Sequence, residues 1–254
     1  MARITLLGTG TCVPSLTRSA CAALVQTGTE TLLIDSGPGT MRRLLEAGIS
    51  IDELTGIFYT HMHPDHTAEL VPLLFATKYP ACTRTRPLPI YGGEGFGAFF
   101  EQLKGVYGEW MDPGPGLVRL TELSVEQEDL FHQGDLAVRT APVAHRPESL
   151  ACRVVLSGGR SVVFSGDTGP SENLVSLARG ADIFVCECST PDAEAVPNHL
   201  TPSLAGEAAK AAQVGMLVLT HFYPACDKVD VEKECRKTYD GQLVLGEDLK
   251  PFDL

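Results

Sequence analysis

The chain has 254 residues, of which 44% are hydrophobic and 20% charged, which is typical of a globular protein with a sizeable core. Its formal net charge is −12, which argues against an extended nucleic-acid surface, because phosphate-binding surfaces are usually basic. No apolar run approaches the roughly 20 residues of a membrane span, and the N-terminus lacks the pattern of a secretion signal. We therefore expect a cytoplasmic protein without a membrane anchor, whose eight cysteines stay reduced.

Short apolar runs bounded by Gly, Pro, Asp or Ser predict strands along the whole chain. These runs are Arg3–Leu7, Ala22–Gln26, Thr31–Asp35, Gly56–Tyr59, Leu88–Tyr91, Leu117–Leu123, Leu136–Thr140, Ala151–Leu156, Ser161–Ser165, Ile183–Cys186 and Met216–Thr220. Helical periodicity occupies some of the intervals, and the predicted helices are Thr40–Ala47, Leu70–Lys78, Gly95–Tyr107, Ser171–Ala178 and Thr201–Val214. The last is the clearest, since it begins with Thr201 as N-cap and Pro202 at the first helical position.

Runs of strands in both halves, each with helices after them, indicate two sheets packed face to face and covered by helices. No segment has the composition of a linker. The sequence therefore predicts an α/β fold, a four-layer αββα sandwich, with residues 1–254 forming a single domain.

The densest group of potential metal ligands is the stretch THMHPDH at residues 60–66. His61 and His63 are two residues apart at the end of a predicted strand, so their side chains point the same way and can share a metal. Asp65 and His66 follow Pro64 and can face a second metal from the same loop. Imidazole and carboxylate groups are usual zinc ligands, and the alternative is a surface cluster of histidines.

Three more ligand-type residues, His145, Asp167 and His221, each directly follow a separate apolar strand. A lone histidine in such a place is more often a hydrogen-bonding residue, but three repeats of one arrangement favour convergence at one edge of the sandwich. Cys186 and Cys188 are expected to share a strand face in the core rather than to bind metal.

The H-x-H-x-D-H motif, with His, Asp and His at 145, 167 and 221, resembles the metallo-β-lactamase fold superfamily over most of the chain. The resemblance implies that His61, His63 and His145 hold one ion. It implies that Asp65, His66 and His221 hold a second and that Asp167 bridges them. The expected cofactors are two divalent ions, with zinc ahead of manganese or iron, which would activate a metal-bridging hydroxide.

The N-terminal LGTG, a Pro loop and D-x-G-x-G-T at residues 35–40 resemble the ribonuclease Z branch. This resemblance implies that Asp35 orients the site and that His199, helped by Glu187, donates a proton to the leaving oxygen. His199, Glu187 and Asp65 form the expected catalytic set. The alternative for Asp35 is that it is only a turn residue, and the alternative for His199 is that it merely precedes a helix. Gly8 and Gly10 do not complete a dinucleotide motif, and we interpret them as a turn.

Two departures from ribonuclease Z make tRNA binding doubtful. The long basic arm that this branch inserts between the ligands at 145 and 167 is replaced by a hairpin, and Ser19 stands where an Asn is usual. A small-molecule or short phosphodiester substrate is therefore favoured. Candidate phosphate contacts, with a solvated surface role as the alternative, are Arg18, Arg84, Arg86 and Arg146. The 109–116 loop with Trp110 is a candidate lid.

The leading hypothesis is a dinuclear metal-dependent phosphodiesterase. Hydrolysis of a carboxylic ester, lactone, thioester or aryl sulfate at the same site is an alternative, because a fold does not fix one chemistry. A metal-binding accessory or carrier protein without catalysis is a second alternative. The ribonuclease Z resemblance also implies a homodimer.

Overall fold

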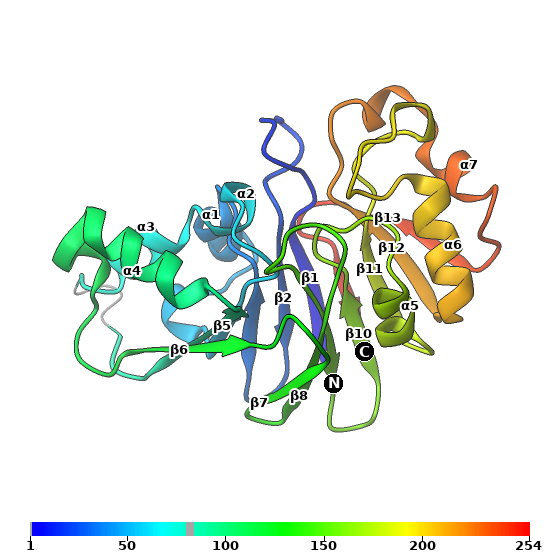
Figure 1. The fold of residues 1–254 in the computed structure, drawn as a ribbon. Coiled ribbons are helices and arrows are strands. Elements are labelled where there is room, and N and C mark those ends of the chain that lie inside the picture. Colours follow the sequence, from blue (N-terminus) through cyan, green and yellow to red (C-terminus); the bar gives the residue numbers. More distant parts are fainter. Residues whose placement is uncertain (1, 80–83) are drawn as a thin grey trace.

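The computed structural model describes residues 2–79 and 84–254. Two mixed β-sheets pack face to face, and helices cover the outer face of each sheet (Figure 1). The predicted α/β four-layer αββα sandwich is confirmed. No helix in the described part of the chain is long and apolar enough to cross a membrane.

Each sheet has seven strands among the described residues. The first sheet, in spatial order, consists of β14 (Pro251–Asp253), β1 (Arg3–Gly8), β2 (Ala22–Gln26), β3 (Thr31–Ile34), β4 (Gly56–Phe58), β5 (Leu88–Gly93) and β6 (Val118–Leu123). The second consists of β13 (Gln242–Leu245), β12 (Met216–Thr220), β11 (Ile183–Glu187), β10 (Ser161–Phe164), β9 (Leu150–Val155), β8 (Leu136–Pro142) and β7 (Asp129–Gln133).

The strand directions bring several carboxyl ends to one edge of the sandwich. In the first sheet β3, β4, β5 and β6 run parallel, and in the second β10, β11, β12 and β13 do so. β8 shares the direction of β10, because both pair antiparallel with β9 between them. Loops from both sheets therefore leave the same edge, at the top of Figure 1.

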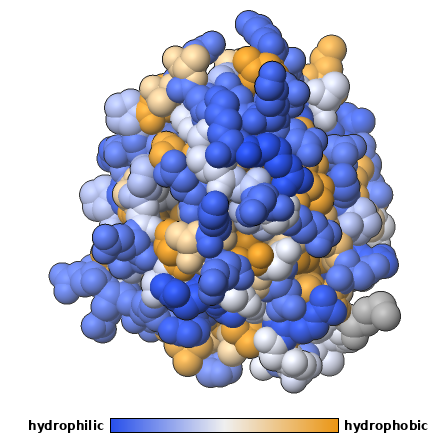
Figure 2. Space-filling view, turned by 90° about the vertical axis from the view of Figure 1, so that its right-hand side faces the viewer, coloured by the Kyte–Doolittle hydropathy of each residue, from blue (hydrophilic) through white to orange (hydrophobic). Residues whose placement is uncertain are grey.

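The first sheet is covered by α1 (Thr40–Glu46), α2 (Pro64–Thr67), α3 (Leu70–Ala76) and α4 (Phe96–Tyr107), and the second by α5 (Glu172–Ala178), α6 (Pro202–Ala212) and α7 (Val231–Cys235). Figure 2 views the side of the molecule that lies at the right of Figure 1, and its surface is largely hydrophilic with scattered hydrophobic residues. On α6 the charged side chains of Glu207 and Lys210 are exposed, whereas Ala205 and Ala209 are buried against the second sheet.

Alternation along the strands separates the core into layers. On β1, Ile4 and Leu6 face the core between the sheets, whereas Leu7 packs under the helices of the first half. Burying one such side chain contributes about 1.5–3 kcal/mol to folding. Cys186 and Cys188 are fully buried under the helices of the second half, which confirms their prediction as core residues.

The structure contains elements that the sequence pattern did not predict, namely β7, β13, β14, α7 and the single-turn α2. β14 is a three-residue edge strand that begins with Pro251, and β7 and β13 are edge strands with partly exposed residues, so their apolar pattern is weak. The expected strand at 31–35 ends at Ile34, because Asp35 adopts a left-handed backbone with φ 57°. The last predicted helix ends at Ala212, since Gln213 is also left-handed.

Candidate metal centre

All seven predicted ligand residues converge at the edge where the parallel strands end. The potential ligand atoms of His61, His63, His145 and Asp167 lie within 4.8 Å of one another, and those of Asp65, His66 and His221 form a second such group. The first group contains residues that follow β4, β8 and β10. In the second group, α2 supplies Asp65 and His66, and His221 follows β12. Asp167, His199 and His221 also meet the same distance limit.

In the first group, three imidazole nitrogens point toward a common centre. Nδ1 of His63 lies 3.0 Å from Nε2 of His61 and 3.1 Å from Nε2 of His145. Oδ2 of Asp167 lies 3.7 Å from the His61 nitrogen and 3.9 Å from the His145 nitrogen.

In the second group, Nε2 of His66 lies 3.4 Å from Nε2 of His221. The other oxygen of Asp167, Oδ1, lies 3.2 Å from the first of these nitrogens and 3.3 Å from the second. Oδ2 of Asp65 is 3.6 Å from the His221 nitrogen. Asp167 thus directs one carboxylate oxygen to each group, which is the geometry required of a residue shared between two ions.

Hydrogen bonds to the outer ring nitrogens fix the tautomers in the first group. Nδ1 of His145 lies 3.0 Å from the carbonyl oxygen of Asn198, which can only accept, so Nδ1 carries the hydrogen. Nδ1 of His61 lies 3.0 Å from Oγ1 of Thr60, whose own hydrogen is donated to Asp35. Thr60 therefore accepts from His61. In the neutral rings, both Nε2 atoms are left with free lone pairs that face inward.

The same reasoning holds for the second group. Nδ1 of His66 donates to Oδ2 of Asp35 at 2.8 Å. Nδ1 of His221 lies 3.0 Å from Oγ of Ser189, whose hydrogen is donated to Oε2 of Glu187. Ser189 therefore accepts from His221, and the inner nitrogens of both histidines are left bare in the neutral rings. Such outer partners fix the ring orientation of metal-binding histidines.

The charges of the cluster fit bound cations. Asp35, Asp65, Asp167 and Glu187 are all buried, and among the described residues their recorded ion pairs are with histidines only. Oδ1 of Asp167 is buried and accepts no hydrogen bond from the described residues. Buried carboxylates and inward lone pairs without donors are costly unless a cation satisfies them. The donor set therefore suits divalent metal ions, whose identity it does not specify.

The pKa shifts of the histidines show how protons and cations compete here. Burial lowers the pKa of His61 far below its usual value, which keeps this ring neutral. Burial also acts to lower the pKa of His66, but the Asp167 and Asp35 carboxylates outweigh it and raise the pKa. A proton on His66 and a metal ion thus compete for the same lone pair, so metal binding releases that proton.

His199 lies beside both ligand groups and is held by a buried carboxylate. Its Nδ1 is 3.0 Å from Oε1 of Glu187, and its ring centre lies 4.8 Å from that of His145 and 5.9 Å from that of His221. Glu187 also accepts from the backbone N–H groups of Thr168 and Leu200. Burial acts to lower the pKa of His199, and the hydrogen bond with Glu187 outweighs it, so the pKa is raised.

The sequence pattern did not identify three residues that orient the cluster: Thr60, Ser189 and the backbone carbonyl of Asn198. Ser189 follows the end of β11 two residues after Glu187, and this position was the only signal available in the sequence. Asn198 is left-handed with φ 62°, which no sequence pattern indicated.

One of the candidate phosphate contacts has a structural role instead. Arg84 is buried and its guanidinium donates to the carbonyl oxygens of Leu54 and Pro87. Arg86 is exposed and donates to the carbonyl oxygen of Asp52, so its contact with substrate stays a prediction. Arg146 is exposed and directly follows His145, so it remains a candidate for contact with substrate.

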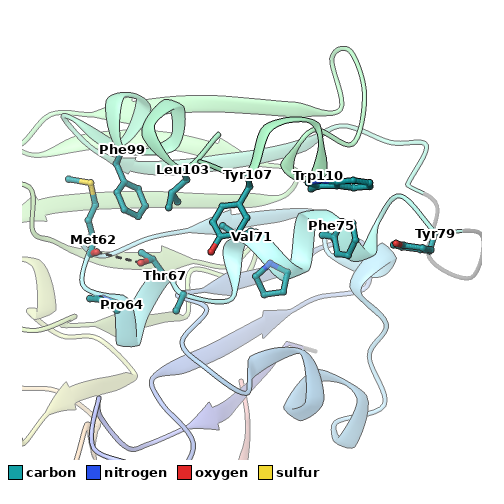
Figure 3. Close-up of a pocket in the computed structure, with 12 residues that line it drawn as sticks. Met62, Pro64, Thr67, Val71, Phe75, Tyr79, Phe99, Leu103, Tyr107 and Trp110 are labelled. Atoms are coloured by element: carbon teal, nitrogen blue, oxygen red, sulfur yellow. Dashed lines mark hydrogen bonds between the residues drawn. The ribbon is translucent and has the colours of Figure 1, made fainter. Parts of the chain in front are cut away.

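An apolar groove of about 780 Å³ lies between α3 and α4 and begins beside the cluster at Met62 and Pro64. Figure 3 shows Met62, Pro64 and Thr67 at one end of this groove and Trp110 toward the other. The Trp110 ring packs against Phe75 of α3 at 5.6 Å. Trp110 thus forms part of the wall of the groove, and the lid interpretation of the 109–116 loop stays a prediction. None of the seven ligand residues lines the groove.

A two-sheet sandwich with a histidine–aspartate cluster at the carboxyl ends of its strands defines a metallohydrolase. The chain belongs to the metallo-beta-lactamase superfamily, whose family model matches residues 18–221. Ribonuclease Z from Mycolicibacterium gilvum (strain PYR-GCK) is 30% identical to it, covering 98% of this chain and 95% of that protein. Ribonuclease Z from Mycobacterium sp. (strain KMS) is 32% identical, covering 98% of this chain and 95% of that protein. The chain is therefore a homologue of ribonuclease Z.

Solved structures agree with this placement. The short form of human tRNase Z has a TM-score of 0.79 at 26% identity, covering 99% of this chain and 98% of that chain. The metallo-beta-lactamase fold protein YhfI from Bacillus subtilis has a TM-score of 0.84 at 22% identity, with both chains covered in full. At this lower identity the similarity shows the fold alone. The comparisons lend no support to the carboxylic ester, sulfate ester or carrier alternatives.

Proposed function

We propose that the protein is a dinuclear metal-dependent phosphodiesterase that acts on a small or short phosphodiester. The observation that carries the proposal is the position of His199. Glu187 holds its Nδ1 at 3.0 Å, so the other ring nitrogen is free beside two ligand groups that share Asp167. The homology to ribonuclease Z supports hydrolysis at phosphorus.

The seven ligand residues would hold two divalent ions, His61, His63 and His145 one of them, Asp65, His66 and His221 the other, with Asp167 between them. When bound, such ions supply Lewis acidity that activates water and neutralises phosphoryl oxygens. Zinc is the proposed ion, because imidazole and carboxylate are its usual ligands, and manganese and iron are the alternatives.

His199 is proposed as the general acid that protonates the leaving oxygen. An alkoxide is a poor leaving group, so a positioned proton donor contributes about 10²–10⁴-fold to its departure. The raised pKa of His199 favours the protonated ring. Glu187 is proposed to hold that ring through Nδ1, which leaves Nε2 to carry the transferred proton. Asp65, the third member of the expected catalytic set, contributes through its place in the second ligand group.

The proposed substrate is small because the chain lacks a basic arm near the cluster. Between His145 and Asp167 the chain forms only β9 and β10 with their short connections. The net charge of −12 and the burial of Arg84 leave little cationic surface for a long polyanion. The homodimer stays a prediction.

The test compares His199→Ala with wild type on two diesters, one with a p-nitrophenolate leaving group and one with an alkoxide. We expect a loss of about 10²–10⁴-fold on the alkoxide and a much smaller loss on p-nitrophenolate, which leaves without a proton. His132→Ala is the control, since this histidine is exposed on β7. Equal losses on both substrates would overturn the role of His199.

A further inference from the structure

A second buried network lies at the base of the loop formed by residues 11–19. At its centre is Asp248, whose side chain is 6% exposed. Oδ1 of Asp248 accepts from the backbone N–H of Thr9 at 2.9 Å and from its hydroxyl at 2.7 Å. Oδ2 accepts from the backbone N–H of Ser19 at 2.6 Å and from the guanidinium of Arg43 at 3.0 Å. One carboxylate thus fixes the chain on both sides of the loop.

The two ends of this loop pack closely enough to require glycine. A Cβ on Gly8 would lie 1.9 Å from the carbonyl oxygen of Ala20, and a Cβ on Gly10 would lie 2.9 Å from that of Ser19. The backbone N–H of Gly10 donates to the Ser19 carbonyl at 2.8 Å. The LGTG motif therefore serves the close approach of two chain segments. Its interpretation as a turn is wrong, since Gly8 is the last residue of β1 and no turn is formed at Gly10.

Arg18 joins this network to the segment after β12 that carries His221. Its guanidinium donates to Oγ1 of Thr9 at 2.7 Å and to the carbonyl oxygen of Gly246 at 2.9 Å. It also lies 4.4 Å from the centre of the Phe222 ring, and the backbone N–H of Phe222 donates to the Thr9 carbonyl at 2.9 Å. Arg18 is therefore engaged inside the protein and does not serve as the expected phosphate contact.

His221 needs such support, because its backbone is left-handed with φ 61°. That conformation is unfavourable for residues other than glycine and persists only where the surrounding structure holds it. Ser189 fixes the ring of His221 through Nδ1, and the backbone is fixed from the other side through Phe222 and Thr9.

We infer that Asp248 and Arg18 are positioning residues, which hold the 11–19 loop against the segment at Phe222 and thereby fix the geometry of His221. The inference rests on the proposed metal centre, because it concerns the placement of one ligand in the second group. It does not depend on which bond the enzyme cleaves.

The test uses Asp248→Asn, which removes the charge but keeps the shape, and Arg18→Ala, which removes the cation on Phe222. Asp253→Asn is the matched control, since this carboxylate is exposed on β14 and pairs with Arg3. Zinc affinity is measured for each full-length variant by competition with a chelator, with no substrate present. Amide hydrogen exchange is followed in residues 9–20 and 219–224, and the Tm is recorded for each protein.

We expect Asp248→Asn and Arg18→Ala each to lower the affinity for one of the two zinc ions by about 10-fold or more and to leave the affinity for the other unchanged. Exchange should rise in both segments but not in the core strands. In the double variant the losses should be less than additive, since both residues act through one network. A lower Tm with unchanged zinc affinity, or zinc affinities equal to that of Asp253→Asn, would overturn the inference. Because no activity is measured, the result is independent of whether the substrate is a phosphodiester.

Discussion

Nε2 of His66 lies 3.4 Å from Nε2 of His221, and the hydrogen bonds at the outer nitrogens leave both atoms without a hydrogen when the rings are neutral. Two lone pairs at this distance repel, and Asp167 adds a carboxylate oxygen 3.2 and 3.3 Å from them. A cation bound between these atoms would therefore relieve their mutual repulsion and stabilise the folded protein.

Removal of metal should destabilise the protein. A ligand present at 100 times its Kd stabilises the folded state by about 2.7 kcal/mol per site, so a chelator should lower the Tm by several degrees. Thermal unfolding with and without chelator, combined with metal analysis, tests this directly. A Tm that does not respond to chelator, together with no metal in the purified protein, would contradict it.

Asp167 and Asp65 should differ in how many ions they affect. Asp167 directs one oxygen to each group, so Asp167→Asn should lower the affinity for both metal ions, whereas Asp65→Asn should lower the affinity for only one. The reason is that, among the described residues, the ion pair of Asp65 is with His221, which belongs to the second ligand group. Metal titration of the two variants measures the number of ions lost, and equal behaviour would exclude the shared role of Asp167.

Ser189→Ala should impair the centre although this residue is no ligand. Its hydroxyl donates to Glu187 and accepts from Nδ1 of His221, so its removal leaves a buried N–H without a partner. We expect a loss of about 10–100-fold in metal affinity or activity and about 1–3 kcal/mol in stability. Ser157→Ala, at an exposed turn, is the control, and identical results for the two variants would refute the orienting role.

Asp192 should make stability depend on pH in acid. Burial acts to raise its pKa, but hydrogen bonds from Lys237 and Ser203 outweigh it and lower the pKa to about 2. The unfolded value is about 3.9, so the contribution is full above about pH 4 and is lost as the pH falls toward 2.

Asp192→Asn should therefore lower the free energy of unfolding by about 1 kcal/mol at pH 7, and the difference from wild type should shrink below pH 4. Urea unfolding of both proteins across this pH range measures it, with the exposed Asp240→Asn as control. A difference that stays constant down to pH 2 would show that the ionised carboxylate contributes nothing.

Much of the centre could be predicted because metal chemistry needs particular atoms at strand ends. The spacing of His61 and His63 identifies them as ligands. Asp167 and His221 are identified by their positions directly after apolar strands. The orienting groups could not be predicted in this way. Ser189 reaches His221 because β11 and β12 pair in a register that sets Glu187 against Thr220, and no local pattern encodes that register.

Arg18 and Arg84 show the opposite limit. A guanidinium in a loop has no periodic pattern, so the sequence could not separate a phosphate contact from a buried hydrogen-bond donor. In the structure Arg84 donates to backbone carbonyls, and Arg18 donates to one backbone carbonyl and to the hydroxyl of Thr9. The short edge strand β14 escaped prediction for a related reason, since three residues beginning with proline carry no alternation.

The most direct test of the account compares steady-state rates of the zinc-loaded protein on bis(p-nitrophenyl) phosphate and on a p-nitrophenyl carboxylic ester, with bound metal measured in the same sample. The account predicts two ions per chain, turnover of the phosphodiester and a kcat/KM for it well above that for the ester, both lost on chelation. Two bound ions with turnover of the ester and none of the phosphodiester would contradict it.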